Sequence, residues 1–309
     1  MKSISALTFD TKEDGWETSK GFIMRQMPMP VLDEENIPKD KVSVILKMKY
    51  AGLCGSDRGI WNRASFKDLI YSSLERKNKT TRILGHEFLG EVTQMGSMVK
   101  QLYSDSFSKE KIEVGSLVSG DSHVTCGKCY QCKIGQNNVC INEAILGISI
   151  DGVFAEYVKI PAKNLWPVNI KAIRPEIAAI LDPFGNAVHA LSKFDPRSRQ
   201  VAVLGAGPIG LFSILLLKNS GASKIIAADI SEKNLQLAKE LGAHETVHIK
   251  NGADIAPKIL EMTDGRGADV AMEMAGPNSS VNTALEITRR GGQVVLFGLK
   301  DGDFTIPKF

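Results

Sequence analysis

From residue 200 onward, short apolar segments alternate with amphipathic helical segments, and this alternation limits the fold more than any other feature of the chain. Such a succession builds a parallel sheet with helices on both faces. We therefore predict an α/β chain with a doubly wound parallel sheet in this part. The expected strands are 200–205, 224–229, 246–249, 269–275 and 293–298, and the expected helices are 208–220, 231–241, 254–262 and 279–289.

A glycine-rich turn, Gly-Ala-Gly-Pro-Ile-Gly at 205–210, joins the first of these strands to its helix. In this context the first glycine permits a tight turn, the second lets the backbone approach a pyrophosphate, and the third allows close helix–strand packing. Asp229 ends the next strand, where a carboxylate binds both ribose hydroxyls and repels a 2′-phosphate. The pattern predicts a Rossmann domain that binds NAD rather than NADP, with a flavodoxin-like fold lacking a dinucleotide as the alternative. The residues expected at the cofactor are Gly205, Gly207, Ile209, Gly210 and Asp229.

The sequence before about residue 165 has short apolar segments interrupted by Gly, Pro and Asp. Residues 41–48 and 153–160 alternate apolar with polar side chains, which predicts antiparallel or mixed β structure with long loops. Residues 175–194 look helical apart from Pro183 and Gly185, so we expect a linking helix that is kinked or begins late. Because 309 residues exceed what one hydrophobic core usually serves, we predict a β-rich domain at 1–175. The linking helix and nucleotide-binding domain would occupy 176–300, with a short remainder at 301–309.

Four of the five cysteines lie close together, at Cys126, Cys129, Cys132 and Cys140. Four thiolates within reach of one ion suit a closed, tetrahedral structural zinc site. A bacterial ferredoxin cluster is the alternative, but its last gap is shorter and a proline follows it, whereas Ile141 stands here. The odd number of cysteines argues against a complete disulfide framework, so we expect reduced thiols and a cytoplasmic location.

The fifth cysteine, Cys54, opens the segment Cys-Gly-Ser-Asp at 54–57, and His86 and Glu87 follow well downstream. Spacing alone does not join them, although the three protein ligands of a catalytic zinc can come from anywhere in a fold. A cysteine packed as a small hydrophobe and a surface histidine beside a glutamate are the alternative.

The charge balance indicates which partners to expect. Lys and Arg total 38 against 35 for Asp and Glu, a net charge of +3 that gives no reason to expect nucleic acid or an anionic membrane surface. No apolar run approaches the roughly 18 residues that a membrane span needs, and the first residues do not read as a secretory signal. We expect a small-molecule partner.

Together these features resemble the zinc-dependent medium-chain alcohol dehydrogenases, which pair a β-rich, GroES-like catalytic domain with a Rossmann domain. The resemblance runs through 54–57, 85–87, the four-cysteine segment and the dinucleotide motif with Asp229. It implies an NAD-dependent enzyme with one catalytic and one structural zinc, which oxidises a small polar secondary alcohol. Segments 120–127, 154–157 and 182–189 favour the 3-hydroxyl of L-threonine as the substrate. A polyol such as sorbitol, or a truncated non-catalytic relative that binds NAD, are the alternatives.

The resemblance also implies roles for individual residues. The catalytic zinc ligands of the family match Cys54, His86 and Glu87, and Asp182 matches an acidic position that approaches the same metal. Ser56 matches the hydroxyl residue that takes the substrate proton. Asp57 would fix the imidazole of His86 for coordination. Whether Glu87 or Asp182 completes the zinc ligand set stays open.

Three features depart from the family pattern. Gly59 occupies the position of a proton-relay histidine, and Asn234 occupies that of a basic residue after the ribose-binding acid. Relatives continue past the fifth Rossmann strand into a sixth that forms the dimer edge, whereas this chain stops at Phe309. We therefore expect an unpaired edge at 293–298, and a homodimer or tetramer when the chain is full length.

Overall fold

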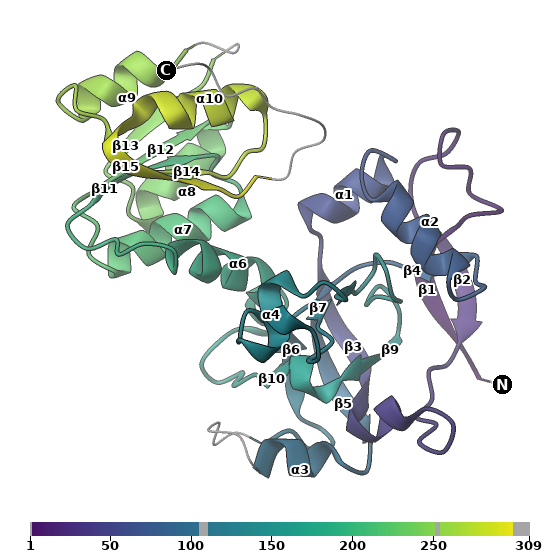
Figure 1. Cartoon of the computed structure of the whole chain (residues 1–309). Helices are drawn as coiled ribbons and strands as arrows, with labels where there is room; N and C mark the ends of the chain where they lie inside the picture. The colour runs from purple at the N-terminus through teal and green to yellow at the C-terminus, as the bar shows by residue number, and fades with distance from the viewer. Residues whose placement is uncertain (1, 105–110, 251–253, 299–309) are drawn as a thin grey trace. The chain divides into compact units, whose positions relative to one another are not determined.

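The computed structural model describes residues 2–104, 111–250 and 254–298 (Figure 1). By its internal contacts the chain divides into two compact units, Met1–Asp182 and Pro183–Phe309. Residues 176–182 group with the first unit, and the domain boundary after residue 175 stays a prediction. The expected remainder at 301–309 lies outside the described residues.

The first unit is antiparallel β structure with long loops, as its sequence predicts. Its described residues form sheets of strand order β2-β1-β4, β10-β6-β5-β3-β9 and β7-β8. The strands are β1 (Ser3–Asp10), β2 (Ile23–Pro28), β3 (Ser43–Gly52), β4 (Thr81–Ile83), β5 (Glu87–Met95), β6 (Leu117–Gly120), β7 (His123–Val124), β8 (Ala144–Ile145), β9 (Tyr157–Pro161) and β10 (Leu165–Pro167). The helices are η1 (Pro38–Val42), α1 (Gly55–Trp61), α2 (Lys67–Glu75), α3 (Val99–Ser104), α4 (Tyr130–Lys133), η2 (Asn137–Val139), η3 (Ala162–Asn164) and α5 (Pro175–Ala178).

Alternating side chains build the core of the five-stranded sheet. On β9, Val158 and Ile160 are buried while Tyr157, Lys159 and Pro161 are partly exposed, as a period of two requires. They pack in one cluster with Val44 and Leu46 of β3 and with Phe88 of β5. The antiparallel β3–β5 pairing brings Gly52 opposite Glu87, which joins segments that are distant in the sequence.

The linking helix is interrupted earlier than its sequence suggests. Helix α5 ends at Ala178, and α6 (Leu181–Leu191) begins after a short break. Pro183 and Gly185 lie inside α6 and do not interrupt it. The prediction of a late start is right, but the break lies at 179–180. Pro183 does not interrupt α6 because it lies in the first turn, where its missing N–H has no helical partner.

The second unit holds a parallel sheet of order β13-β12-β11-β14-β15, the order of the first strands of a Rossmann fold. Its strands are β11 (Gln200–Leu204), β12 (Lys224–Asp229), β13 (Glu245–His248), β14 (Ala268–Glu273) and β15 (Thr288–Leu296). The helices after α6 are α7 (Pro208–Asn219), α8 (Glu232–Leu241), α9 (Ala256–Met262) and α10 (Asn278–Ile287).

Helices cover both faces of this sheet. Val201 and Val203 of β11 pack with Ile214 of α7 and Leu235 of α8. Ala202 and Leu204 of the same strand belong to a second cluster, with side chains from α9 and α10. Figure 1 shows α7 and α8 on one side of the sheet and α9 and α10 on the other. The doubly wound prediction is confirmed.

The last strand begins earlier than expected. Helix α10 ends at Ile287 and β15 starts at Thr288, whereas the sequence pattern predicts helix to 289 and strand from 293. Arg289 bonds Asp269 of β14 through its Nε at 2.6 Å, and the register shifts by a bulge before Gln293 pairs with Val270. Among the described residues β15 pairs with β14 alone. None of the helices in the described part of the chain has the length and apolar character needed to cross a bilayer.

Candidate active site

Cys54, His86 and Glu87 come together in the first unit. Cys54 precedes α1, and His86 directly precedes β5, which begins at Glu87 and pairs with the strand that leads to Cys54. One thiol sulfur, one imidazole nitrogen and one carboxylate oxygen lie within 4.8 Å of one another. His86 and Glu87 are buried. Long-range strand pairing therefore brings together three residues whose proximity cannot be derived from their spacing in the sequence.

The electrostatics of this group fit a cation. Burial, followed by the neighbouring Cys54 thiol, raises the pKa of Glu87 to about 8. A bound cation favours the charged carboxylate and the thiolate and so reverses this shift. A thiolate, an imidazole and a carboxylate form a donor set that suits zinc with a position left open.

Asp57 lies behind the imidazole of His86. Its Oδ1 is 3.6 Å from His86 Nδ1, and its Oδ2 accepts a hydrogen bond of 2.9 Å from the Cys54 backbone N–H. On the other side of the ring, His86 Nε2 lies 3.4 Å from the Ser56 hydroxyl. His86 Nδ1 and Asp57 Oδ1 are both buried, and neither has a hydrogen-bond partner among the residues that the structure describes. The arrangement fits a carboxylate that orients a ligating histidine.

Asp182 lies near this group but outside the 4.8 Å set. Its charge contributes to the raised pKa of Glu87. Asp182 Oδ1 accepts hydrogen bonds from the Ser122 hydroxyl at 3.1 Å and from the Ser122 backbone N–H at 3.4 Å. Ser122 is buried and was not singled out from the sequence, since its pairing with Asp182 depends on the tertiary fold.

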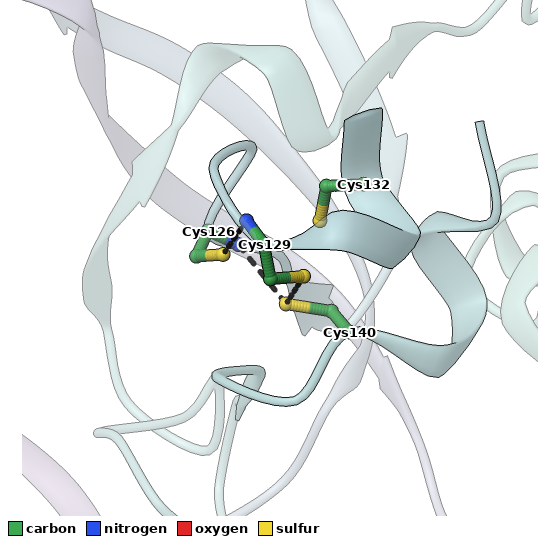
Figure 2. Close-up of side chains that lie close together, drawn as sticks. All are labelled: Cys126, Cys129, Cys132 and Cys140. Atoms are coloured by element: carbon green, nitrogen blue, oxygen red, sulfur yellow. Dashed lines mark hydrogen bonds between the residues drawn. The ribbon is translucent and has the colours of Figure 1, made fainter. Parts of the chain in front are cut away.

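The other four cysteines form a second cluster around α4, with their ligand atoms within 4.8 Å of one another (Figure 2). Backbone N–H groups of Lys128 and Cys129 donate to Cys126 Sγ at 3.4 and 3.3 Å. These two donors are the largest causes that lower the pKa of the Cys126 thiol to about 6. Cys126 N–H donates in turn to Cys140 Sγ at 3.3 Å. The convergence of four sulfurs fits a closed tetrahedral ion.

The glycine-rich turn has the geometry that its sequence predicts. Gly205 has a φ of +102°, and a Cβ at Gly210 would lie 2.0 Å from the Gly205 carbonyl oxygen. A Cβ at Gly207 would meet nothing within 4 Å, so this side of the loop is open to an approaching ligand. Gly207 precedes α7, with Pro208 and Ile209 in its first turn. An open loop at a helix N-terminus suits a phosphate.

Asp229 supports this loop as well as ending β12. Its Oδ2 accepts a 2.6 Å hydrogen bond from the Ala206 N–H, and its Oδ1 accepts a 2.7 Å bond from the Ser231 N–H. These bonds fix the buried carboxylate beside the glycine turn. Asn234 lies in the first turn of α8, where its N–H donates to the hydroxyl of Ser231, the N-cap residue.

The surroundings of residue 59 favour glycine for a reason that the sequence does not reveal. A Cβ at this position would lie 2.8 Å from the Ser65 hydroxyl oxygen and 3.0 Å from its Cβ. A histidine here therefore requires Ser65 to move.

The comparisons with known proteins agree with this geometry. Residues 40–170 match the alcohol dehydrogenase GroES-like domain, and residues 208–309 match the zinc-binding dehydrogenase domain. The chain is 36% identical over 295 residues to an L-threonine 3-dehydrogenase of Bacillus subtilis, covering 96% of this chain and 77% of the relative. It is 37% identical over 278 residues to an L-threonine 3-dehydrogenase of Pyrococcus horikoshii, covering 89% and 74%.

Two solved structures share the fold of nearly the whole chain. An NADP-bound putative zinc-binding dehydrogenase from Sinorhizobium meliloti superposes with a TM-score of 0.79 at 26% identity, covering 99% of this chain and 80% of that one. An alcohol dehydrogenase from Thermus sp. ATN1 gives a TM-score of 0.78 at 26% identity, covering 98% and 80%. With its GroES-like β domain, its Rossmann sheet and these relatives, the chain belongs to the zinc-dependent medium-chain alcohol dehydrogenases.

Proposed function

We propose that this chain is a zinc-dependent oxidoreductase that transfers a hydride from a small polar secondary alcohol to NAD, with the 3-hydroxyl of L-threonine as first substrate. The observation that carries the proposal is the convergence of Cys54, His86 and Glu87 within 4.8 Å beside the Ser56 hydroxyl. The names of the curated relatives support threonine as the substrate.

Cys54, His86 and Glu87 would hold the catalytic zinc, and the four clustered cysteines would hold the structural one. When bound, the catalytic zinc supplies a Lewis acid that lowers the pKa of the substrate hydroxyl. Asp57, whose Oδ1 lies 3.6 Å from His86 Nδ1, would orient the imidazole for coordination. Asp182 adds negative charge beside Glu87, which we propose helps to balance the charge of the metal.

Ser56 would receive the proton of the substrate hydroxyl. Its Oγ lies 3.4 Å from His86 Nε2, which places a proton acceptor beside the candidate ligands. Because Gly59 replaces the relay histidine, the proton leaves Ser56 by another path in this proposal.

NAD would bind along the open side of Gly207, with Asp229 at the ribose. Both oxygens of Asp229 already accept backbone N–H groups, and each keeps a lone pair for a ribose hydroxyl. A 2′-phosphate would meet this carboxylate with like charge, so we propose that NAD is preferred over NADP.

The proposal also covers the cellular location and the oligomeric state of the protein. None of the five cysteines, all in the described part of the chain, forms a disulfide, which supports a reducing, cytoplasmic compartment. The position of β15 at the edge of its sheet, among the described residues, supports pairing between copies of the chain as a homo-oligomer.

The test is NADH formation by zinc-loaded protein with NAD and a panel of L-threonine, sorbitol and simple secondary alcohols. We expect the highest kcat/KM with L-threonine and no turnover in Cys54→Ser. A higher kcat/KM with sorbitol would favour the polyol alternative. Full zinc loading and NAD binding without oxidation of any alcohol would refute the enzymatic proposal.

A further inference from the structure

A pocket of about 870 Å³ opens in the first unit on one side of α1. Apolar and aromatic side chains make up most of its wall, and Cys54 and Asp57 of the candidate site also line it. The remaining wall is polar, from Arg58 and Asn62. The apolar residues of the lining are Leu7, Phe22, Leu53, Trp61 and Phe154.

Two apolar side chains of this wall are largely exposed. Leu53 is 80% exposed and Trp61 is 47% exposed. Large apolar groups that share a concave surface with a few polar groups are the usual lining of a small-molecule site. The volume also lies in the range of about 300–1,000 Å³ for drug-sized ligands, far more than threonine fills.

Arg58 supplies the only cation of the pocket lining in the described part of the chain. It is exposed, and its guanidinium makes no hydrogen bond or ion pair with any residue that the structure describes. The Asn62 amide donates to the Arg58 carbonyl oxygen at 3.0 Å, which ties the two polar residues together through the backbone. Asp57, the nearby carboxylate, faces His86 and the Cys54 N–H.

We propose that this pocket receives the groups that flank the reacting carbon, an apolar substituent on one side and the carboxylate-bearing carbon on the other, and that Arg58 binds the carboxylate. The inference rests on the proposed function and extends its substrate class from L-threonine to related hydroxy acids that carry an apolar or aromatic substituent in place of the methyl group of threonine. One unpaired guanidinium matches one negative charge and can bind a carboxylate through two parallel hydrogen bonds. A phosphate dianion would bring a second negative charge, and the described lining holds no second cation to balance it. Arg58 is in this proposal a specificity-determining residue that contacts the substrate away from the reacting atoms.

The first test compares kcat/KM for L-threonine, threo-3-phenylserine and the carboxamides of both in the wild type, Arg58→Ala and Arg76→Ala. Arg76 is an exposed arginine outside the pocket lining and serves as the matched control. We expect phenylserine to exceed threonine by at least about tenfold, since burial of an aromatic ring stabilises its complex. Arg58→Ala should lower kcat/KM for phenylserine by about tenfold and leave its carboxamide unchanged. Equal effects on acid and amide, or no effect, would overturn the role of Arg58.

The second test measures binding without turnover, so that it does not depend on the enzymatic proposal. The zinc-loaded protein is titrated calorimetrically with 3-phenylpropanoate, which has no hydroxyl group to oxidise, and with 3-phenylpropanamide. We expect the acid to bind more tightly than the amide, and the difference to vanish in Arg58→Ala and in the length-conserving Arg58→Gln. Binding of this kind without oxidation of any alcohol would refute the proposed function and keep the pocket assignment. Turnover without any dependence on Arg58 would refute the pocket assignment and keep the proposed function.

Discussion

Gly52 offers a way to separate loss of the catalytic metal from loss of the fold. A Cβ added there would lie 2.2 Å from Glu87 Oε2 and 2.9 Å from Glu87 Cβ. Contacts below 3.0 Å are essentially never observed, so the carboxylate oxygen has to retreat by about 0.8 Å, several times the roughly 0.2 Å tolerance of a zinc–ligand distance. We therefore expect Gly52→Ala to weaken zinc binding at Cys54, His86 and Glu87 by about 10- to 100-fold, the usual cost of disturbing a ligand's support.

The same substitution should leave the first unit folded. Gly52 lies on β3 and is not among the glycines of positive φ. The general preference of about 0.5–1 kcal/mol for alanine over glycine in a strand offsets part of the strain from Glu87 Cβ at 2.9 Å and Ile180 Cγ2 at 3.1 Å. Gly55→Ala is the matched control, because a Cβ at Gly55 meets nothing within 4 Å although the residue follows Cys54 directly.

The assay is a competition titration of zinc against a chromophoric chelator, together with the melting temperature and the zinc content per chain. Wild type and Gly55→Ala should hold two zinc ions, and Gly52→Ala should hold one tightly. Retention of two tightly bound ions in Gly52→Ala would refute the assignment of Glu87 as a ligand. A collapse of the melting temperature in Gly52→Ala would instead refute the separation of metal binding from folding.

Three further predictions concern the other candidate residues. Cys140→Ser should lower the melting temperature, because a closed thiolate site contributes folding free energy, whereas Cys54→Ser should keep the fold and lose turnover; equal losses of melting temperature would contradict this division. Asp229→Ala should narrow the preference for NAD over NADP mainly by weakening the binding of NAD, and the ratio of the kcat/KM values for the two cofactors measures this preference. A wild-type protein that turns over faster with limiting NADP than with limiting NAD would show that Asp229 is wrongly assigned. Gly59→His should be combined with Ser65→Gly, which removes the side-chain atoms that a Cβ at position 59 would meet. The double variant should raise the rate of alcohol oxidation more at low pH than at high pH, where hydroxide can take the proton. An unchanged pH–rate profile in the folded double variant would show that the proton leaves by another path.

The second unit could be predicted from its sequence because its signals are local. The turn at 205–210 lies between a strand and a helix that are adjacent in the chain, and each glycine has the local surroundings that its motif requires. The start of β15 was predicted wrongly because it depends on contacts with another strand. The Asp269–Arg289 contact and the bulge opposite β14 fix the start of the strand, and neither can be derived from the residues of the strand itself.

The candidate active site shows the opposite case. Its members are joined by the β3–β5 register and by contacts such as that between Ser122 and Asp182, which depend on long-range pairing. Periodicity carries no information on such pairing, so residue spacing does not predict that Cys54 and His86 share a metal site. Only the family resemblance predicts it. The steric conflict at Gly59 was likewise hidden, because Ser65 approaches it through a loop.

Strand β11 has a consequence for how the second unit loses its structure. Val201 and Val203 anchor one helix layer, and Ala202 and Leu204 anchor the other, so consecutive residues of one strand serve both. Detaching either layer exposes alternate side chains of the same strand to water and weakens the support of the opposite layer. The two layers are therefore coupled through β11 into one cooperative unit of unfolding, and the glycine turn that follows Leu204 is held by the most protected part of that unit.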